Sequence, residues 1–272
     1  MRKRPLSIAF ALLLVIFGGC SNSSSQSESK KVTFLIGEHE YGTPQSLPKF
    51  ASEHLEPLGI KSQFIFAAGN DRNSEACHQF EGIAEALSDS DLLVISVRRR
   101  YPLVDDLAKI RAWIEAGRPV VLVRTASHAF GEREKGVGYQ APPGHAAWNT
   151  FDVDVLGASY QGHYREKEGE NRLNVETWIE ESASSHPIIK GLNFSDPFMI
   201  GDKLYEYIEP DPAIDVLLSA RYQEGEPAHP VAWTNQKEGK RVFYMSTGGL
   251  DEMALPQVQS LLKSAVQWGL DG

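Results

Sequence analysis

Short, nearly apolar runs alternate with helical stretches over residues 32–123. This pattern restricts the possible folds of the chain more than any other feature does. The most apolar runs lie at 32–36, 91–97 and 119–123, with a more mixed run at 60–66. Strands that read as continuous apolar runs are typical of parallel sheets buried on both faces. We therefore expect an α/β fold with a mostly parallel central sheet.

The stretches between these runs carry helical signals. Leucine and isoleucine residues at 103, 107, 110 and 114 share one helix face. Gly117 and Pro119 then end this predicted helix. Two further helices are expected at 47–58, with Pro48 in the first turn, and at 80–87. Helices of this kind would cover the sheet.

The second half of the chain is less regular. It holds four predicted strands and a closing helix, at 173–179, 214–218, 231–234, 242–245 and 255–268. Residues 131–164 are expected to form an irregular insertion. Because there is neither an internal repeat nor a second linker, we expect residues 32–272 to form one domain.

The first residues have the pattern of an export signal. Three basic residues at 2–4 precede an apolar run at 6–17, which is shorter than the roughly 20 residues that span a membrane. Gly18 and Gly19 before Cys20 are typical of a bacterial lipoprotein signal, although Phe17 departs from the usual leucine. We expect 1–19 to be a signal peptide, Cys20 to be lipidated, and the Ser-rich segment 20–31 to be a tether.

This leader predicts an exported lipoprotein of the bacterial cell envelope, periplasmic or at the cell surface, that contacts the membrane through its N-terminal lipid. The alternative is an ordinary signal peptide cut near Gly19, with Cys20 incidental. Two cysteines cannot build a disulfide scaffold, and Cys77 is interpreted as a packing residue. The net charge of −9 argues against nucleic acid as a partner, more so once the basic leader is removed.

Polar side chains follow three of the predicted parallel strands. They lie at 37–41, 98–101 and 124–128. Because ligands of open parallel sheets bind outside the carboxyl ends of the strands, we expect a polar site there. The opposite ends of the strands are expected to carry less charge.

Two carboxylates, Glu38 and Glu40, flank His39 after the first strand. If the backbone stays extended, both carboxylates lie on one side, where they could perform acid/base chemistry or hold a metal. The alternative is that they neutralise nearby arginines, among them Arg98.

The segment after the fourth strand offers Ser127 and His128 without a G-x-S-x-G motif. Adjacent side chains rarely face each other, so His128 is favoured as an acid, base or ligand over Ser127 as a nucleophile. His163 and His145 lie in the insertion. A divalent metal site formed by His39, His128, His145 or His163 remains an open alternative, although no H-E-x-x-H motif is present. Trp148 could stack on a sugar face, and no nucleotide cofactor is expected.

Several stretches, taken in order, resemble the ThuA-like trehalose-utilisation family. They are the segments ending in His128 and His163, and residues 186–192, 202–205, 230–234 and 239–244. The resemblance implies a class I glutamine amidotransferase-like fold, which is a flavodoxin-like three-layer α/β sandwich. Ala126 and Ser127 stand where amidotransferases carry their catalytic cysteine, and no later His-x-Glu pair follows. We therefore do not expect glutamine amidotransferase activity.

The resemblance also implies carbohydrate metabolism, with a disaccharide or keto-sugar as the small-molecule partner. Acid/base chemistry would isomerise or cleave it, as in a sugar isomerase, hydrolase or lyase. Family members often carry a histidine near the position of Gly249 here. The alternatives are a non-catalytic sugar-binding or assembly module and a general structural lipoprotein. The sequence requires no cofactor and leaves homo-oligomer formation open.

The expected catalytic residues are His128, His163, Glu38 and Glu40, and the expected substrate-binding residues are Arg98, Arg124, Ser127 and Trp148.

Overall fold

A computed structural model describes residues 29–69, 74–131, 141–164, 175–201, 203–208, 210–249 and 251–272. The predicted signal peptide and Cys20 lie outside these residues, as does most of the predicted tether. Among the described residues, no helix is both long and apolar enough to cross a membrane.

The parallel strands form one half of a nine-stranded sheet in the order β2-β1-β3-β4-β11. Their bounds are Lys31–Gly37 for β1, Lys61–Phe66 for β2, Leu92–Val97 for β3, Val120–Val123 for β4 and Val242–Met245 for β11. This is the strand order of flavodoxin-like folds, whose ligands bind where the order switches direction. The predicted fold class is confirmed.

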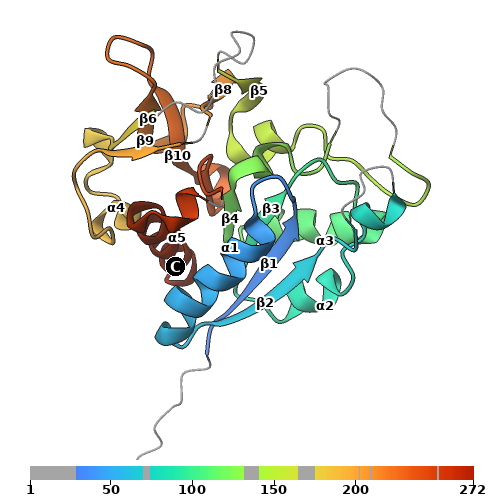
Figure 1. The fold of residues 1–272 in the computed structure, drawn as a ribbon. Helices are drawn as coiled ribbons and strands as arrows, with labels where there is room; N and C mark the ends of the chain where they lie inside the picture. Colours follow the sequence, from blue (N-terminus) through green and yellow to red (C-terminus); the bar gives the residue numbers. More distant parts are fainter. Residues whose placement is uncertain are drawn as a thin grey trace, which may run out of the picture.

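Antiparallel strands extend the sheet beyond β11 in the order β10-β9-β6-β7. These strands span His229–Asn235 (β10), Ile214–Arg221 (β9), Val175–Ile179 (β6) and Phe198–Ile200 (β7). A separate two-stranded ribbon pairs β5 (Ser159–His163) with β8 (Tyr205–Ile208). Figure 1 shows this ribbon beyond the upper ends of the central strands. We expected only an irregular insertion up to residue 164, so β5 is an addition to the sequence-based prediction.

The main helices cover both faces of the sheet (Figure 1). Their bounds are Thr43–Phe50 for α1, Ile83–Ser88 for α2, Val104–Glu115 for α3, Pro187–Lys190 for α4 and Pro256–Leu270 for α5. Apolar residues of α1, α4 and α5 share one core, while those of α2 and α3 share the other. The chain therefore forms three layers, helices–sheet–helices.

Short 3-10 and π segments connect these elements. The 3-10 segments are Glu56–Leu58, Glu75–His78, Arg124–His128, Glu181–Ala183, Lys237–Gly239 and Glu252–Ala254, and the π segments are Ala51–Leu55 and Asp152–Leu156. The helix predicted from residue 47 begins at Thr43, so Pro48 lies inside it rather than in its first turn. A proline inside a helix removes one backbone hydrogen bond, and the wider π turn follows directly.

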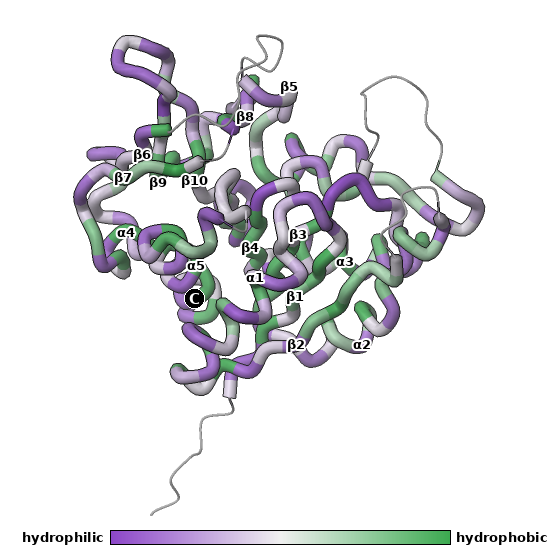
Figure 2. Tube along the Cα trace, in the orientation of Figure 1, coloured by the Kyte–Doolittle hydropathy of each residue, from purple (hydrophilic) through white to green (hydrophobic). Residues whose placement is uncertain are grey.

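The central strands feed both cores because their side chains alternate across the sheet. Phe34 and Ile36 of β1 enter the core under α1 and α5, while Leu35 enters the opposite core. Val94 of β3 and Leu93 divide in the same way. Figure 2 shows the resulting hydrophobic centre in β1 and β3. Burial on both faces accounts for the continuous apolar runs in the sequence.

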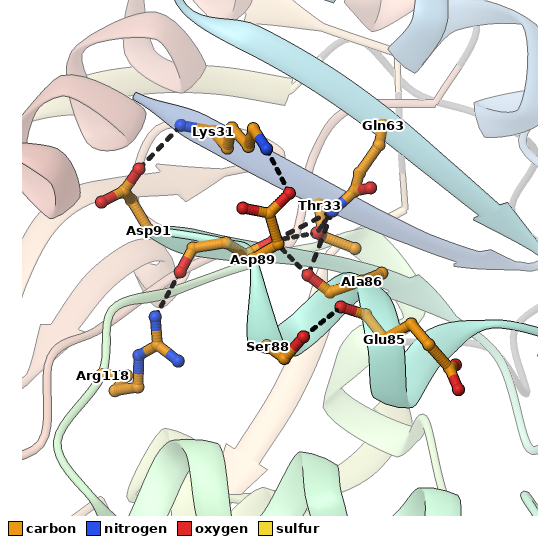
Figure 3. Close-up of polar contacts among 10 residues, drawn as sticks. Lys31, Thr33, Gln63, Glu85, Ala86, Ser88, Asp89, Asp91 and Arg118 are labelled. Carbon is orange, nitrogen blue, oxygen red and sulfur yellow. Dashed lines mark hydrogen bonds and ion pairs between the residues drawn. The ribbon is translucent and has the colours of Figure 1, made fainter. Parts of the chain in front are cut away.

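The amino ends of the strands also carry charge, which corrects our expectation of a less charged edge. The backbone N–H of Lys31 donates to Asp91 at 2.8 Å, and its ammonium group pairs with Asp89. The Arg118 guanidinium donates to the Ser90 carbonyl (Figure 3). Because these groups are paired with one another, this edge is interpreted as structural.

Gly117 joins α3 to β4 and provides a test of this packing. Its φ of +70° lies in the left-handed region, and an added Cβ would lie 2.7 Å from the Gly239 carbonyl oxygen. Gly59 has a similar φ of +75°, but nothing lies within 4 Å of an added Cβ. Gly59→Ala should therefore cost only the conformational penalty, about 1 kcal/mol.

We expect Gly117→Ala to lower the free energy of unfolding by clearly more than Gly59→Ala does, because the backbone of Gly239 must also shift. Urea denaturation of both variants measures the difference. Equal losses in the two variants would show that the close approach of Gly117 to Gly239 is not tight in solution.

Candidate functional site

Glu38 follows β1 and is buried, with 1% of its surface exposed. Its carboxylate accepts hydrogen bonds from the backbone N–H groups of Tyr41 and Thr43, both at 2.9 Å, and from the Thr43 hydroxyl. Thr43 begins α1, so Glu38 satisfies a donor that the first turn of that helix leaves open. The carboxylate of Glu38 thus holds the β1–α1 loop.

Glu40 and its neighbour His39 are exposed at the rim of the strand ends. The Glu40 carboxylate accepts a hydrogen bond from Arg98 Nη1 at 2.5 Å. The loop therefore does not place Glu38 and Glu40 in one shared site, as an extended backbone would have done. Instead, Glu40 follows the alternative in which an acidic residue neutralises an arginine.

Arg99 connects the ends of β3 and β4. Its φ of +52° lies in the left-handed region, which non-glycine residues rarely adopt. In this conformation its backbone N–H donates to the His128 carbonyl at 2.9 Å, and that of Arg100 donates to the Ala129 carbonyl at 2.8 Å. The strained turn therefore fixes the segment that carries His128.

Arg124 lies at the end of β4, also in a left-handed conformation, with φ of +56°. It is 1% exposed, and its Nη1 donates to the Ser246 carbonyl at 2.6 Å. The guanidinium carbon lies 4.3 Å from the ring centre of Tyr41 and 4.7 Å from that of Tyr205. Such cation–π contacts stabilise a cation that has lost its water. Arg124 is a fixed positive charge inside the site.

His128 stacks on Tyr160, with ring centres 4.5 Å apart and an interplanar angle of 19°. Burial lowers the pKa of His128 well below its usual value, and the nearby charges of Arg99 and Arg98 lower it further. His128 is therefore neutral at physiological pH. A neutral imidazole can accept a proton, as a general base must.

Ser127 and His128 do face each other, contrary to our expectation for adjacent residues. The Ser127 hydroxyl lies 3.0 Å from His128 Nδ1. The reason is local, because Arg124–His128 is a 3-10 turn rather than a strand, and its side chains do not alternate between opposite faces.

The β5–β8 ribbon brings a second histidine to this edge. His163 stacks on Tyr205 with ring centres 5.2 Å apart, and the His128 ring centre lies 6.1 Å from the same tyrosine. His128, His163 and Arg124 thus surround one buried phenol. The structure brings together three of the predicted site residues in this way.

Tyr160, which stacks on His128, and three further tyrosines of the site were not predicted from the sequence. Tyr205 and Tyr207 come from β8, and Tyr244 comes from β11. The Tyr244 hydroxyl donates to the Arg124 carbonyl at 2.8 Å and lies 2.7 Å from the Tyr207 hydroxyl. The alternating Tyr205-Glu206-Tyr207 pattern was the available signal, since it places two aromatic rings on one side of a strand.

Trp148 lies apart from these groups. Its ring is covered by the Arg111 guanidinium at 4.1 Å, and its indole N–H donates to Asp154 at 2.7 Å. It lines a cavity of about 490 Å³ beside α3, together with Glu115 and Lys240. An aromatic face already covered by Arg111 is not open for a sugar to stack on.

His145 also lies outside the group around Tyr205. Its Nδ1 donates to the Tyr101 carbonyl at 2.5 Å, and its Nε2 lies 3.3 Å from the Glu75 carboxylate. Within the described ranges, no cluster of three or more His, Cys, Asp or Glu side chains is placed to hold a metal ion. The described residues therefore provide no set of ligands for a divalent metal.

The segment after β11 carries Gly248 with φ of +113°, then Gly249, whose carbonyl accepts the backbone N–H of Met253 at 2.8 Å. Glu252 follows and is 4% exposed. Gly249 has no side chain where the resemblance implies a histidine, and Glu252 is a nearby buried acidic residue.

The loop-holding role of Glu38 makes a prediction. We expect Glu38→Ala to lower the free energy of unfolding by about 2–3 kcal/mol, because it leaves buried donors of the β1–α1 loop without an acceptor. The exposed Glu40→Ala is the matched control and should cost less than about 1 kcal/mol. Urea denaturation measures both. A Glu38→Ala variant as stable as Glu40→Ala would contradict this role.

Comparisons with known proteins agree with this architecture. The model of the ThuA family, described as trehalose utilisation, matches residues 31–269. A ThuA-like protein from Bacteroides uniformis has a similar structure, with a TM-score of 0.61, 16% sequence identity, and coverage of 89% of this chain and 91% of that chain.

A ThuA-like protein from Parabacteroides merdae is similarly related, with a TM-score of 0.60, 15% identity, and coverage of 89% of this chain and 90% of that chain. No curated protein matches the chain. At these identities the two structures show the shared fold alone. Because the family model covers most of the sequence, the chain belongs to the ThuA, or trehalose utilisation, family.

Proposed function

We propose that the carboxyl edge of the sheet is an active site that acts on a disaccharide or keto-sugar by acid/base chemistry. The observation that carries this proposal is the neutral His128 beside the buried cation Arg124, with His163 stacked on Tyr205, whose ring both His128 and Arg124 also approach. The family's association with trehalose utilisation supports a carbohydrate substrate.

The chemistry follows from these charges. His128 removes a proton from the carbon next to the sugar carbonyl, and the carbonyl oxygen becomes negative. Arg124, with Arg98 at the rim, stabilises that negative oxygen. In an isomerisation, a protonated His163 gives a proton to the former carbonyl carbon, while the hydroxyl proton of the neighbouring carbon passes to the negative oxygen. In a cleavage, it protonates the leaving oxygen. The proton taken by His128 then returns to His163 through solvent. Ser127 holds His128, and Glu38 holds the loop that carries Tyr41 against Arg124.

A non-catalytic sugar-binding or assembly module is the second candidate function. Gly249 favours it, because the turn after β11 lacks the histidine that the family resemblance implies. The two candidates differ in turnover. The module predicts binding of sugar without any chemical change, and binding that survives replacement of His128.

The test is incubation of the purified protein with 3-keto-disaccharides, followed by NMR, with added divalent metal and with a chelator. We expect product with the wild-type protein and a loss of at least about a hundredfold in kcat for His128→Asn. His54→Gln is the control, because His54 lies in the π segment after α1, on the stretch that leads to the amino end of β2. No product under either condition would contradict an enzymatic role.

The same assay has an expected pH dependence. The pKa of His128 is lowered in the folded protein, so the neutral, proton-accepting form persists as the pH falls through 6.5. We expect the acidic limb of the kcat/KM profile to lie below pH 6.5. An acidic limb at or above the usual histidine pKa would argue against His128 as the base.

We also propose that the protein is anchored in the bacterial cell envelope through a lipid on Cys20. When the full chain is expressed in a bacterial host, we expect wild type in the membrane fraction, with acyl chains detected by mass spectrometry on the N-terminal peptide. Cys20→Ser should move the protein to the soluble fraction. Wild type without acyl chains would favour the ordinary signal peptide.

A further inference from the structure

We propose that the Tyr205 hydroxyl is a catalytic hydrogen-bond donor, which binds the carbonyl oxygen of the substrate beside Arg124. Tyr205 begins β8, in the ribbon that lies beyond the ends of the central strands (Figure 1). The identity of the bound oxygen rests on the proposed function. The readiness of this hydroxyl to bind a ligand oxygen does not.

The Tyr205 side chain is buried, with 1% of its surface exposed. Its hydroxyl oxygen is closed off from solvent and has no hydrogen-bond partner among the described residues. Two neighbouring tyrosines differ in this respect. The Tyr244 hydroxyl donates to the Arg124 carbonyl at 2.8 Å and lies 2.7 Å from the Tyr207 hydroxyl. Of these three phenols, Tyr205 is the one whose hydroxyl is unused within the described part of the chain.

An unused hydroxyl in a buried position lowers stability, because it gives up its hydrogen bonds to water and gains none in return. Packing does not explain the hydroxyl, since a phenylalanine ring would make the same ring contacts with Arg124 and His163. Buried polar groups are nearly always paired, so an exception calls for a cause such as a catalytic role or a bound water. The groups around the phenol favour a catalytic role.

Tyr205 is surrounded by the groups of the proposed active site. The Arg124 guanidinium carbon lies 4.7 Å from its ring centre, and the ring centres of His163 and His128 lie 5.2 and 6.1 Å away. A cation and two imidazoles thus border the phenol. A substrate oxygen bound to its hydroxyl would lie in the field of Arg124, with the proposed base His128 beside the same phenol.

The hydroxyl serves as a donor because it keeps its proton. Burial raises the pKa of Tyr205 well above its usual value, and the charge of Arg124 offsets this rise only in part. When His128 removes a proton from the neighbouring carbon, the carbonyl oxygen becomes negative, and a hydrogen bond to that oxygen strengthens. Tyr205 gives this hydrogen bond without transferring its proton, so it adds no proton transfer to the reaction.

Access to the hydroxyl depends on β5. The rings of Tyr160 and His163 lie 5.0 and 5.2 Å from the Tyr205 ring, and both residues belong to this half-exposed strand. Because the hydroxyl is closed off from solvent, a substrate must displace a side chain that covers it. Half-exposed side chains of a two-stranded ribbon move at a lower cost than those of the central core.

A stability measurement tests whether the hydroxyl is unused. We expect the full-length Tyr205→Phe protein to have a urea midpoint no lower than that of wild type, because the variant loses no hydrogen bond. Tyr244→Phe is the matched contrast and should have a lower midpoint, since two groups lose their partner. A Tyr205→Phe midpoint as low as that of Tyr244→Phe, or a Tyr205→Phe protein that does not fold, would indicate a structural partner such as a bound water and overturn the inference.

Activity tests the donor itself. With 3-keto-disaccharides, we expect Tyr205→Phe to lower kcat about a hundredfold with a much smaller change in KM, because the hydrogen bond is strongest to the negative oxygen. Tyr164→Phe is the control and should keep the wild-type kcat, since its ring packs against Tyr222 and His229. Wild-type kcat in a folded Tyr205→Phe protein would overturn the inference and leave the proposed function in place.

Binding separates the two proposals if wild type shows no turnover. The measurement is then the rise in urea midpoint that a 3-keto-disaccharide causes. A rise in wild type that is clearly smaller in Tyr205→Phe would retain the hydroxyl as a ligand donor and lose the enzymatic role. Equal rises in both proteins would overturn the donor. A wild type that neither turns over the keto-sugar nor is stabilised by it would overturn both proposals.

Discussion

The burial of a single cation, Arg124, ties together segments that are far apart in the sequence. A guanidinium removed from water is costly unless partners surround it. Its partners here are the Ser246 carbonyl after β11, the Tyr41 ring after β1 and the Tyr205 ring of β8. Each of these segments must therefore keep its place for the charge to stay buried. The apolar core fixes the positions of the strands in the sheet. The burial of Arg124 fixes the positions of the segments beyond their carboxyl ends.

The parallel half of the fold could be predicted because its cause is local and strong. Strands buried on both faces must be apolar throughout, and β1, β3, β4 and β11 follow the predicted runs closely. The β5–β8 ribbon could not be predicted in this way. Its strand β5 is half-exposed, contains Gly162 at φ of +136°, and shifts its register there, so β5 has no regular alternation in its sequence.

The site was predicted in part, for a similar reason. Strand order alone brings the ends of β3 and β4 together, so Arg98, Arg124 and His128 fell on the correct edge. The failures came from short-range geometry. Glu38 looks like half of a carboxylate pair, yet a turn of a few residues folds backbone donors onto it. Ser127 meets His128 because a 3-10 turn replaces the expected strand or elbow. Patterns of residue type do not encode such turns.

The charges of the site favour one kind of step. Protonation of His128 from solvent would place a charge at a buried position beside Arg99, Arg98 and Arg124. Burial lowers the pKa of His128 most, and these cations lower it further. Removal of a proton from a substrate differs, because the positive imidazole and a negative oxygen then form together. In the proposed reaction, Arg124 would stabilise the negative oxygen and oppose the imidazolium, so its two effects on the charge pair offset each other. Burial and these cations keep His128 neutral in the free protein, and the cations oppose its protonation least when an anion forms beside it. This couples the base to its proposed substrate.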